Sequence, residues 1–93
     1  MRVDVAELEL DDENEREMAD HGVSVIELLQ LLDDRIEVFR NRKGRAARHL
    51  MMGVTHGGRV LTVPIVRTAV DGRWRPVTAW ESTPPEKARY QNA

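Results

Sequence analysis

The stretch RHLMMGVTHGGRVLTVPIVRT, residues 48–68, decides the fold of this chain. At its centre His56-Gly57-Gly58 separates two apolar runs, and glycines between two such runs are a strong hairpin signal. Alternation in residues 48–55 and β-branched side chains in residues 59–68 predict the two antiparallel strands of that hairpin. Because Pro64 has no backbone N–H, its position in the second strand requires a sheet edge or a bulge.

Further strands are predicted on both sides of this hairpin. Residues 35–41 alternate with period two until the phase breaks near Arg40, which predicts a short strand that is twisted or bulged. Asp71-Gly72 marks a second tight turn, and residues 73–80 are expected to form the last strand, where Pro76 has the same requirement as Pro64. The tight turns between these strands predict an antiparallel meander.

Two helices are predicted before the hairpin. Asp11 or Asp12 caps a helix that runs to about Asp20, and its thin apolar face places it on the surface. Gly22 suits the left-handed backbone at the corner that follows. The next helix, residues 25–32, is apolar on most of its surface, so we expect it to be the central core helix.

Capping boxes mark two helix starts. Ser24 and Glu27 have the required spacing before the second helix, and Thr83 and Glu86 have it before a short C-terminal helix that runs to about Tyr90. In each box a side chain at the first position binds the backbone N–H three residues later.

The predicted element order is β-α-α-β-β-β-β-α, with a short exposed strand over residues 2–10 at its start. Helices and strands are segregated along the chain, which indicates the α+β class. We expect two N-terminal helices packed on a mainly antiparallel sheet meander, followed by a short C-terminal helix. The length fits one domain, residues 1–93.

The composition narrows the functional classes. The chain has no cysteine, which excludes disulfides and cysteine-based metal or nucleophile sites and fits a reducing compartment. No apolar run reaches the length of a signal peptide or a membrane span. A cytoplasmic protein without a membrane partner is therefore expected.

Charge is divided unevenly along the chain. Residues 1–34 carry a net charge of −10 and residues 35–93 a net charge of +8. Five bases fall within nine residues of the basic part: Arg40, Arg42, Lys43, Arg45 and Arg48. Such asymmetry indicates either a surface that binds a polyanion or two halves that pair with each other or are simply solvated.

Most catalytic signatures are absent from the sequence. His21, His49 and His56 lack the spacing of metal ligands, so no metal and no cofactor are expected. The remaining candidates for a functional site are the arginines on the predicted strands. Reflection about Gly57 pairs position 48 with position 66, which places Arg48 near Arg67. Two neighbouring arginines favour a bound phosphate, and the alternative is that each pairs with a local acid such as Glu81 or Glu37.

Several short segments together resemble the BrnT toxins of the RelE/ParE superfamily. The matching segments occur in the family's order over nearly the whole chain: HGVS (residues 21–24), RHLMMG (48–53), GRVLTV (58–63) with Arg67, RPVTA (75–79) and residues 86–90. The resemblance implies a RelE-like fold and the toxin of a type II toxin–antitoxin system, a ribonuclease that inhibits translation.

The resemblance also implies the residues and partners of that activity. Such a toxin cuts RNA, including mRNA on the ribosome, without a metal, and a DNA-binding antitoxin neutralises it in a homodimeric or hetero-oligomeric assembly. Arg48 and Arg67 match arginines of the family and are the catalytic or phosphate-binding candidates. His49 or Tyr90 would assist proton transfer. The remaining candidates for contact with the RNA backbone are basic: Arg40, Arg42, Lys43, Arg45 and Arg75.

Three departures from the family pattern keep other functions open. Asp20 stands where the family has a lysine, Trp80 where it often has an arginine, and Leu10-Asp11 where it has tryptophan-aspartate. One alternative is a non-enzymatic interaction module with Trp74 and Trp80 either as anchors or as core residues. The other is a ParE-like inhibitor of a topoisomerase.

Overall fold

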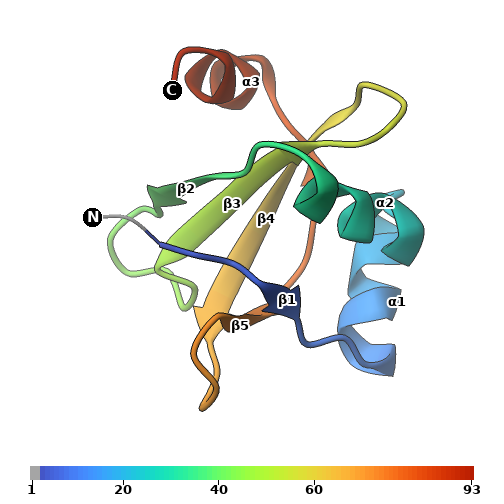
Figure 1. Cartoon of the computed structure of the whole chain (residues 1–93), viewed down its shortest axis with the longest axis vertical. Coiled ribbons are helices and arrows are strands. Elements are labelled where there is room, and N and C mark those ends of the chain that lie inside the picture. The colour runs from blue at the N-terminus through green and yellow to red at the C-terminus, as the bar shows by residue number, and fades with distance from the viewer. Residues whose placement is uncertain (1–2) are drawn as a thin grey trace.

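The predicted hairpin is confirmed by a computed structural model, which describes residues 3–93. Strand β3 (His49–Val54) pairs antiparallel with β4 (Val60–Arg67) at the centre of the sheet (Figure 1). His49 lies opposite Ile65, so the pairing is symmetric about Gly57, as the sequence predicts. Gly58 has a φ of +86°, a left-handed conformation that glycine adopts without a steric penalty.

The sheet is mainly antiparallel and the chain belongs to the α+β class. Its strand order is β1-β5-β4-β3-β2, and β2 (Glu37–Arg40), β3, β4 and β5 (Arg73–Pro76) form the predicted meander. Strand β1 (Glu7–Leu8) lies at the far edge and is parallel to β5.

The last strand differs from its prediction over residues 73–80. It is divided into β5 and a separate strand β6 (Trp80–Glu81), and both pair with β4. Ile65 lies opposite Pro76 and Thr62 opposite Trp80, so residues 77–79 face only two residues of β4. Three residues of one strand therefore lie opposite two of its partner, which is a β-bulge.

The bulge accommodates the proline of the central strand. Val77 donates its N–H to the Pro64 carbonyl at 2.9 Å, so Pro64 directs its backbone groups toward the interrupted partner. The N–H and C=O of one residue point to the same side of a strand, so the missing donor of Pro64 faces the bulge and breaks no ladder bond. The predicted requirement for a bulge at this proline is therefore confirmed.

The predicted strand over residues 2–10 is wrong in length. Only Glu7 and Leu8 pair with β5, and position 2 lies outside the described residues. Val3 and Val5 instead pack against the core as irregular chain, because the alternation of apolar residues slips at Ala6. Strand β1 is at the edge of the sheet, so within the described residues it pairs with β5 alone.

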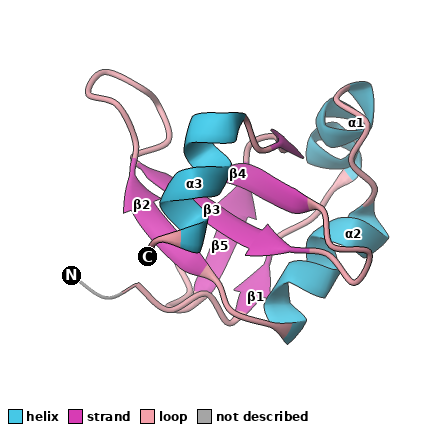
Figure 2. Cartoon of the chain, turned by 90° about the horizontal axis from the view of Figure 1, so that it is seen from above, coloured by secondary structure: helices cyan, strands magenta, loops and turns pink. Residues whose placement is uncertain are grey.

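The helix starts are confirmed. Helix α1 (Asp12–Asp20) is capped by Asp11, and α2 (Val25–Gln30) and α3 (Pro84–Gln91) have the capping boxes of Ser24 and Thr83. Helix α2 continues as a short 3-10 helix, η1 (Leu31–Asp33). Figure 2 shows α1 and α2 beside one face of the sheet and α3 over the other.

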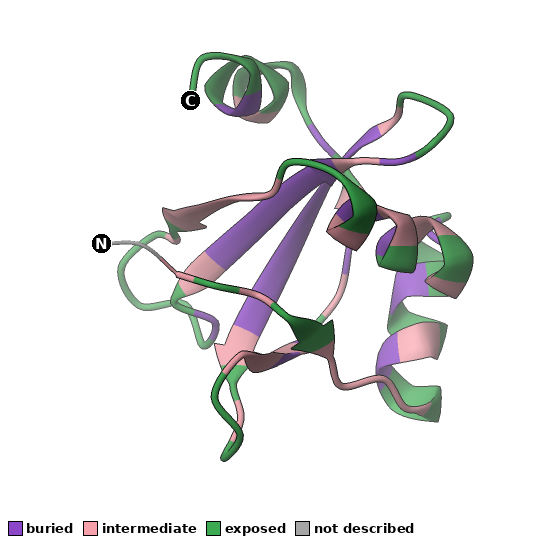
Figure 3. Ribbon diagram, viewed as in Figure 1, coloured by how far each residue is buried: buried purple, intermediate pink, exposed green. Residues whose placement is uncertain are grey.

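Two apolar clusters follow from this arrangement, and both lie on β3 and β4 (Figure 3). The larger one fills the space between the sheet and helices α1 and α2, and its members are Met18, Val23, Leu28, Leu31, Met51, Leu61, Val63, Ile65, Trp74 and Ala79. The smaller one lies under α3 and consists of Met52, Val60 and Tyr90 with Phe39 and Val54 packed against it. Trp74 is thus a core residue.

Burial corrects two expectations for the helices. Helix α2 is not buried on most of its surface, because Ile26 is 70% exposed and Leu29 is 43% exposed. Only its Leu28 side faces the sheet, and no element of residues 3–93 covers the side of Ile26 and Leu29. Helix α1 packs more closely against the rest of the protein than expected, since its side chains Met18 and Asn14 are buried. No helix of the described chain is long and apolar enough to cross a membrane.

Candidate nucleic-acid interface

His49 is at the centre of a group of basic side chains at one end of the sheet. It is the first residue of β3 and lies directly opposite Arg40 of β2. Arg67 is the last residue of β4, two positions beyond the partner of His49. Alternation along the strands puts Arg40, His49 and Arg67 on the face that carries Met51 and Trp74.

The loop between β2 and β3 carries the other cations of this group. Asn41 braces it, because its side chain donates to the Ala47 carbonyl at 2.8 Å and its N–H donates to the Arg48 carbonyl at 2.8 Å. Gly44 turns the chain with a φ of +87°. Within this fixed turn the cations, which are Arg42, Lys43, Arg45 and Arg48, are exposed.

The strand ends and the loop border an open cavity of about 1050 Å³, which we call the basic cavity. Seven of the predicted site residues line it: Arg40, Arg42, Lys43, Arg45, Arg48, His49 and Arg67. The structure thus brings together residues that are up to 27 positions apart in the sequence, and six of these seven side chains are cationic.

Arg48 and Arg67 both line this cavity, although they do not face each other across the hairpin. Extending the register by one residue beyond the His49–Ile65 pair puts position 48 opposite position 66, so Arg67 belongs to the face of the sheet opposite that of Arg48. Its guanidinium lies 4.7 Å from the centre of the Trp74 ring, and the His49 ring meets the same indole edge-on at 5.2 Å. Trp74 therefore orients two residues of the cavity, a role that the sequence analysis did not assign to it.

The environment of His49 favours the neutral form of its imidazole. Burial lowers the pKa of His49 below the ordinary histidine value, and the positive charges of Arg67, Arg40 and Arg48 lower it further. A neutral imidazole has one ring nitrogen free to accept a proton. The cavity therefore offers a base surrounded by guanidinium groups.

The cations of the basic cavity have no acidic partners within the described chain. Elsewhere arginines are paired: Arg73 and Arg75 with Glu9, Arg75 also with Asp11, Arg35 with Glu37, and Arg59 with Glu27 and Glu81. No carboxylate of residues 3–93 lies within 4.0 Å of the six cavity cations. Glu81 and Glu37, the local acids considered as partners of Arg48 and Arg67, are engaged with other arginines.

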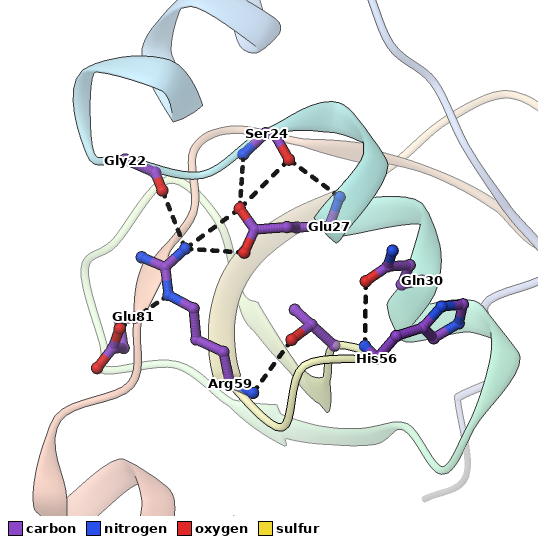
Figure 4. Close-up of polar contacts among 8 residues, drawn as sticks. Gly22, Ser24, Glu27, Gln30, His56, Arg59 and Glu81 are labelled. Carbon is purple, nitrogen blue, oxygen red and sulfur yellow. Dashed lines mark hydrogen bonds and ion pairs between the residues drawn. The ribbon is translucent and has the colours of Figure 1, made fainter.

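Arg59 is the hub of a structural network on the opposite side of the fold (Figure 4). Its guanidinium donates to the Gly22 carbonyl at 3.0 Å, to Glu27 at 3.0 Å and to Glu81 at 2.8 Å. The Ser24 N–H, and to a smaller extent Arg59, lower the pKa of Glu27 against the effect of burial. This network joins the helix corner to β6 and leaves Arg59 unavailable to a ligand.

Tyr90 and Arg75 lie outside the basic cavity. The Tyr90 side chain is buried, its hydroxyl donates to the Arg35 carbonyl at 2.7 Å, and the Arg35 guanidinium lies 4.2 Å above its ring. Arg75 lies on β5 opposite Val66, next to Arg67, but it binds Asp11 and Glu9 and does not line the basic cavity. The hydrogen bond to Asp11 raises the pKa of Arg75.

The residues that depart from the resembled family also lie away from the basic cavity. Asp20 is the exposed last residue of α1. Trp80 donates its indole N–H to Glu86 at 3.0 Å and lines a different cavity. The described residues contain no group of three histidine, cysteine or carboxylate side chains placed to hold a metal ion. No protein-family model matches this sequence, and no curated protein matches it significantly.

Proposed function

We propose that this chain is a metal-independent endoribonuclease that cuts RNA in the basic cavity and inhibits translation as the toxin of a type II toxin–antitoxin pair. The observation that carries the proposal is a half-buried imidazole, His49, whose pKa is lowered, lined up with Arg40 and Arg67 on adjacent strands. The family resemblance of the sequence supports the biological role, and the unpaired cations support an RNA ligand.

In the proposed reaction the ribose 2′-hydroxyl attacks the neighbouring phosphorus atom. His49 takes the proton from the 2′-oxygen as the O2′–P bond forms. The bond from phosphorus to the 5′-oxygen breaks, which leaves a 2′,3′-cyclic phosphate, and water supplies the proton to the departing 5′-oxygen. Arg48 and Arg67 hold the phosphate and stabilise the charge that develops on its oxygens.

Binding of the phosphate removes the effect of the arginines on the pKa of His49. In the free protein their charges lower its pKa, so the imidazole is ready to accept a proton. A bound phosphodiester compensates these charges and raises the affinity of the imidazole for a proton during the reaction. One cluster of arginines therefore both binds the substrate and tunes the base.

Growth arrest and RNA cleavage test the proposal directly. Expression of the wild-type chain should stop growth, and the purified protein should cut single-stranded RNA or ribosome-bound mRNA in the presence of EDTA. Arg48→Ala and Arg67→Ala should abolish both effects, and His49→Gln should slow cleavage by about 10²–10⁴-fold, the usual contribution of a general base. The matched control is Arg16→Ala, which removes an exposed cation from α1, outside the basic cavity.

Salt dependence measures the same interface independently of catalysis. If all six cavity cations contact single-stranded RNA, the slope of log K against log salt is about −4, and Arg45→Ala makes it shallower by about 0.7. Arg16→Ala should leave the slope unchanged. A wild-type chain that neither arrests growth nor cuts RNA, with or without ribosomes, would refute the ribonuclease.

The proposed setting is the cytoplasm, where the partners are RNA and a cognate DNA-binding antitoxin. A neighbouring reading frame for a small DNA-binding protein would support this setting, and co-expression of that protein should restore growth. A homodimer or a toxin–antitoxin hetero-oligomer is the expected assembly.

A second candidate function is a non-enzymatic interaction module. The uncovered apolar side of α2, which includes Ile26 and Leu29, favours it. Partner binding that survives Arg48→Ala and Arg67→Ala, without RNA cleavage, would identify this module. A supercoiling assay with gyrase tests the ParE-like alternative.

A further inference from the structure

A second cavity of about 520 Å³ lies on the other side of the loop that borders the basic cavity. Leu50, Met52, Pro64 and Val77 line it together with Trp80, so much of its surface is apolar. Its charged lining residues are Arg40, Arg42, Arg45, Arg89 and Glu86. An apolar site with a few convergent polar groups is the usual form of a small-ligand pocket.

Glu86 is the single carboxylate of this cavity and is held in place by three donors. Its Oε1 accepts from the Thr83 N–H at 2.9 Å, from the Trp80 indole at 3.0 Å and from the Thr62 hydroxyl at 3.2 Å. No hydrogen bond from the described residues reaches Oε2. One fixed acceptor is therefore left for a ligand.

Glu86 is ionised at neutral pH. Burial opposes its ionisation, but the hydrogen bonds from Thr83, Trp80 and Thr62 outweigh burial and lower its pKa below the ordinary glutamate value. An ionised carboxylate only accepts hydrogen bonds, whereas arginines only donate them. The cavity thus presents acceptor and donor groups around an apolar surface.

The two cavities are continuous in their lining. Arg40, Asn41, Arg42, Arg45 and Ala46 border both of them. An RNA strand that follows the arginines of this loop would therefore border both cavities.

We infer that the cavity of Glu86 binds a guanine base of the RNA substrate and gives the enzyme its sequence preference. This inference rests on the proposed ribonuclease function. Guanine carries donors at N1 and N2, which suit the free oxygen of Glu86, and acceptors at O6 and N7, which arginine recognises in a bidentate way. Uracil has only one ring N–H donor and no amino group, so it satisfies the carboxylate less well.

The two tryptophan indoles allow a binding experiment that distinguishes the two cavities. The Trp80 N–H is bonded to Glu86, whereas the Trp74 N–H donates to the Asp4 carbonyl in the other half of the fold. In ¹H–¹⁵N spectra, 5′-GMP should shift the Trp80 indole signal in a saturable way. Because Trp74 contacts Arg67 and His49, a shift of its signal reports phosphate bound in the basic cavity instead. 5′-UMP should bind at least about tenfold more weakly, as expected for the loss of a hydrogen bond to a charged group.

A ligand lacking one group and a matched variant locate the contact. Inosine 5′-monophosphate lacks only the 2-amino group of guanine, so it should also bind about tenfold more weakly than 5′-GMP. This comparison uses the wild-type protein and therefore does not depend on the folding of a variant. Glu86→Gln should weaken 5′-GMP to a similar extent and leave 5′-UMP nearly unchanged. Glu13→Gln, an exposed carboxylate change on α1, is the control.

Equal binding of 5′-GMP, 5′-UMP and inosine 5′-monophosphate, or a Trp80 signal that does not move at saturating 5′-GMP, would overturn the inference. The cleavage assay separates this failure from failure of the proposed function. RNA that is cut in the basic cavity without preference for guanine leaves the ribonuclease intact and refutes the guanine site. Selective binding of 5′-GMP without any RNA cleavage refutes the ribonuclease and leaves the base-binding cavity.

Discussion

Replacing Gly53 by alanine should destabilise the fold, because β3 passes very close to the 3-10 helix at this glycine. A Cβ at position 53 would lie 3.1 Å from the Cβ of Leu31, 3.4 Å from its Cδ2 and 3.5 Å from its Cγ. Leu31 is completely buried in the larger cluster, so it cannot turn away without disturbing its neighbours. Added atoms in a packed core cost about 1–3 kcal/mol.

Two opposing effects set the net magnitude for Gly53→Ala. Alanine reduces the conformational freedom of the unfolded chain, which contributes about 0.4–1 kcal/mol to stability when the native backbone suits it. Subtracting this gain leaves an expected loss of about 0–2.6 kcal/mol, or about 1.3 kcal/mol at the midpoints of the two ranges. For a domain of this size each kcal/mol lowers the melting temperature by about 4–8 °C.

The control for this experiment is Gly57→Ala in the hairpin turn. A Cβ there would meet only Thr55 Oγ1 at 3.8 Å, which is an ordinary contact. Urea and thermal denaturation, followed by circular dichroism, should show a loss for Gly53→Ala and little change or a small gain for Gly57→Ala. A Gly53→Ala protein as stable as the wild type would show that the close approach to Leu31 does not constrain the fold.

Three further predictions address the caps, the tyrosine and the histidine. Ser24→Ala removes the hydroxyl that accepts from the Glu27 N–H at 3.1 Å and should lower the free energy of unfolding by about 0.5–2 kcal/mol in urea denaturation. Tyr90→Phe removes the hydrogen bond to the Arg35 carbonyl and should cost about 0.5–1.5 kcal/mol. Its RNA cleavage rate should equal that of the wild type, and a large drop in that rate would place Tyr90 in the reaction. Because the folded-state pKa of His49 is below its unfolded value, the unfolded chain binds the proton more readily, and stability is lost as pH falls through the ordinary histidine range. His49→Gln should flatten this part of the pH dependence of stability between pH 7 and pH 5, and an unchanged profile would show that His49 titrates normally.

Local chemistry made much of the fold predictable from the sequence. A capping box fixes a helix start within four residues, so the starts at Ser24 and Thr83 were predicted correctly. The hairpin register followed from one short turn, because pairing on both sides of a tight turn is symmetric about it. These features depend on residues close together in the chain, where the sequence pattern is sufficient.

The features that the sequence did not predict depend on distant elements. The division of the last strand arises where Pro64 of β4 meets residues 77–79, and neither segment alone fixes the offset between them. The exposure of Ile26 depends on the absence of any described element over that side of α2. The separation of Tyr90 from the arginines of the basic cavity likewise follows from the packing of α3 on the face of the sheet opposite α1 and α2.

The charge asymmetry of the sequence acquires a specific meaning in the folded chain. Acids of the first third pair with arginines near them in space: Glu9 and Asp11 with Arg75, and Glu27 with Arg59. Pairs at such exposed sites contribute only about 0–1 kcal/mol each, so their effect on stability is small. Their effect on the charge distribution is larger, because they compensate Arg59 at the hairpin and Arg75 on β5 and leave the cations of the basic cavity unpaired. Since a polyanion binds where cations are free to replace its counterions, the positions of the acids, more than the positions of the arginines, determine which cations remain for the RNA of the proposed function.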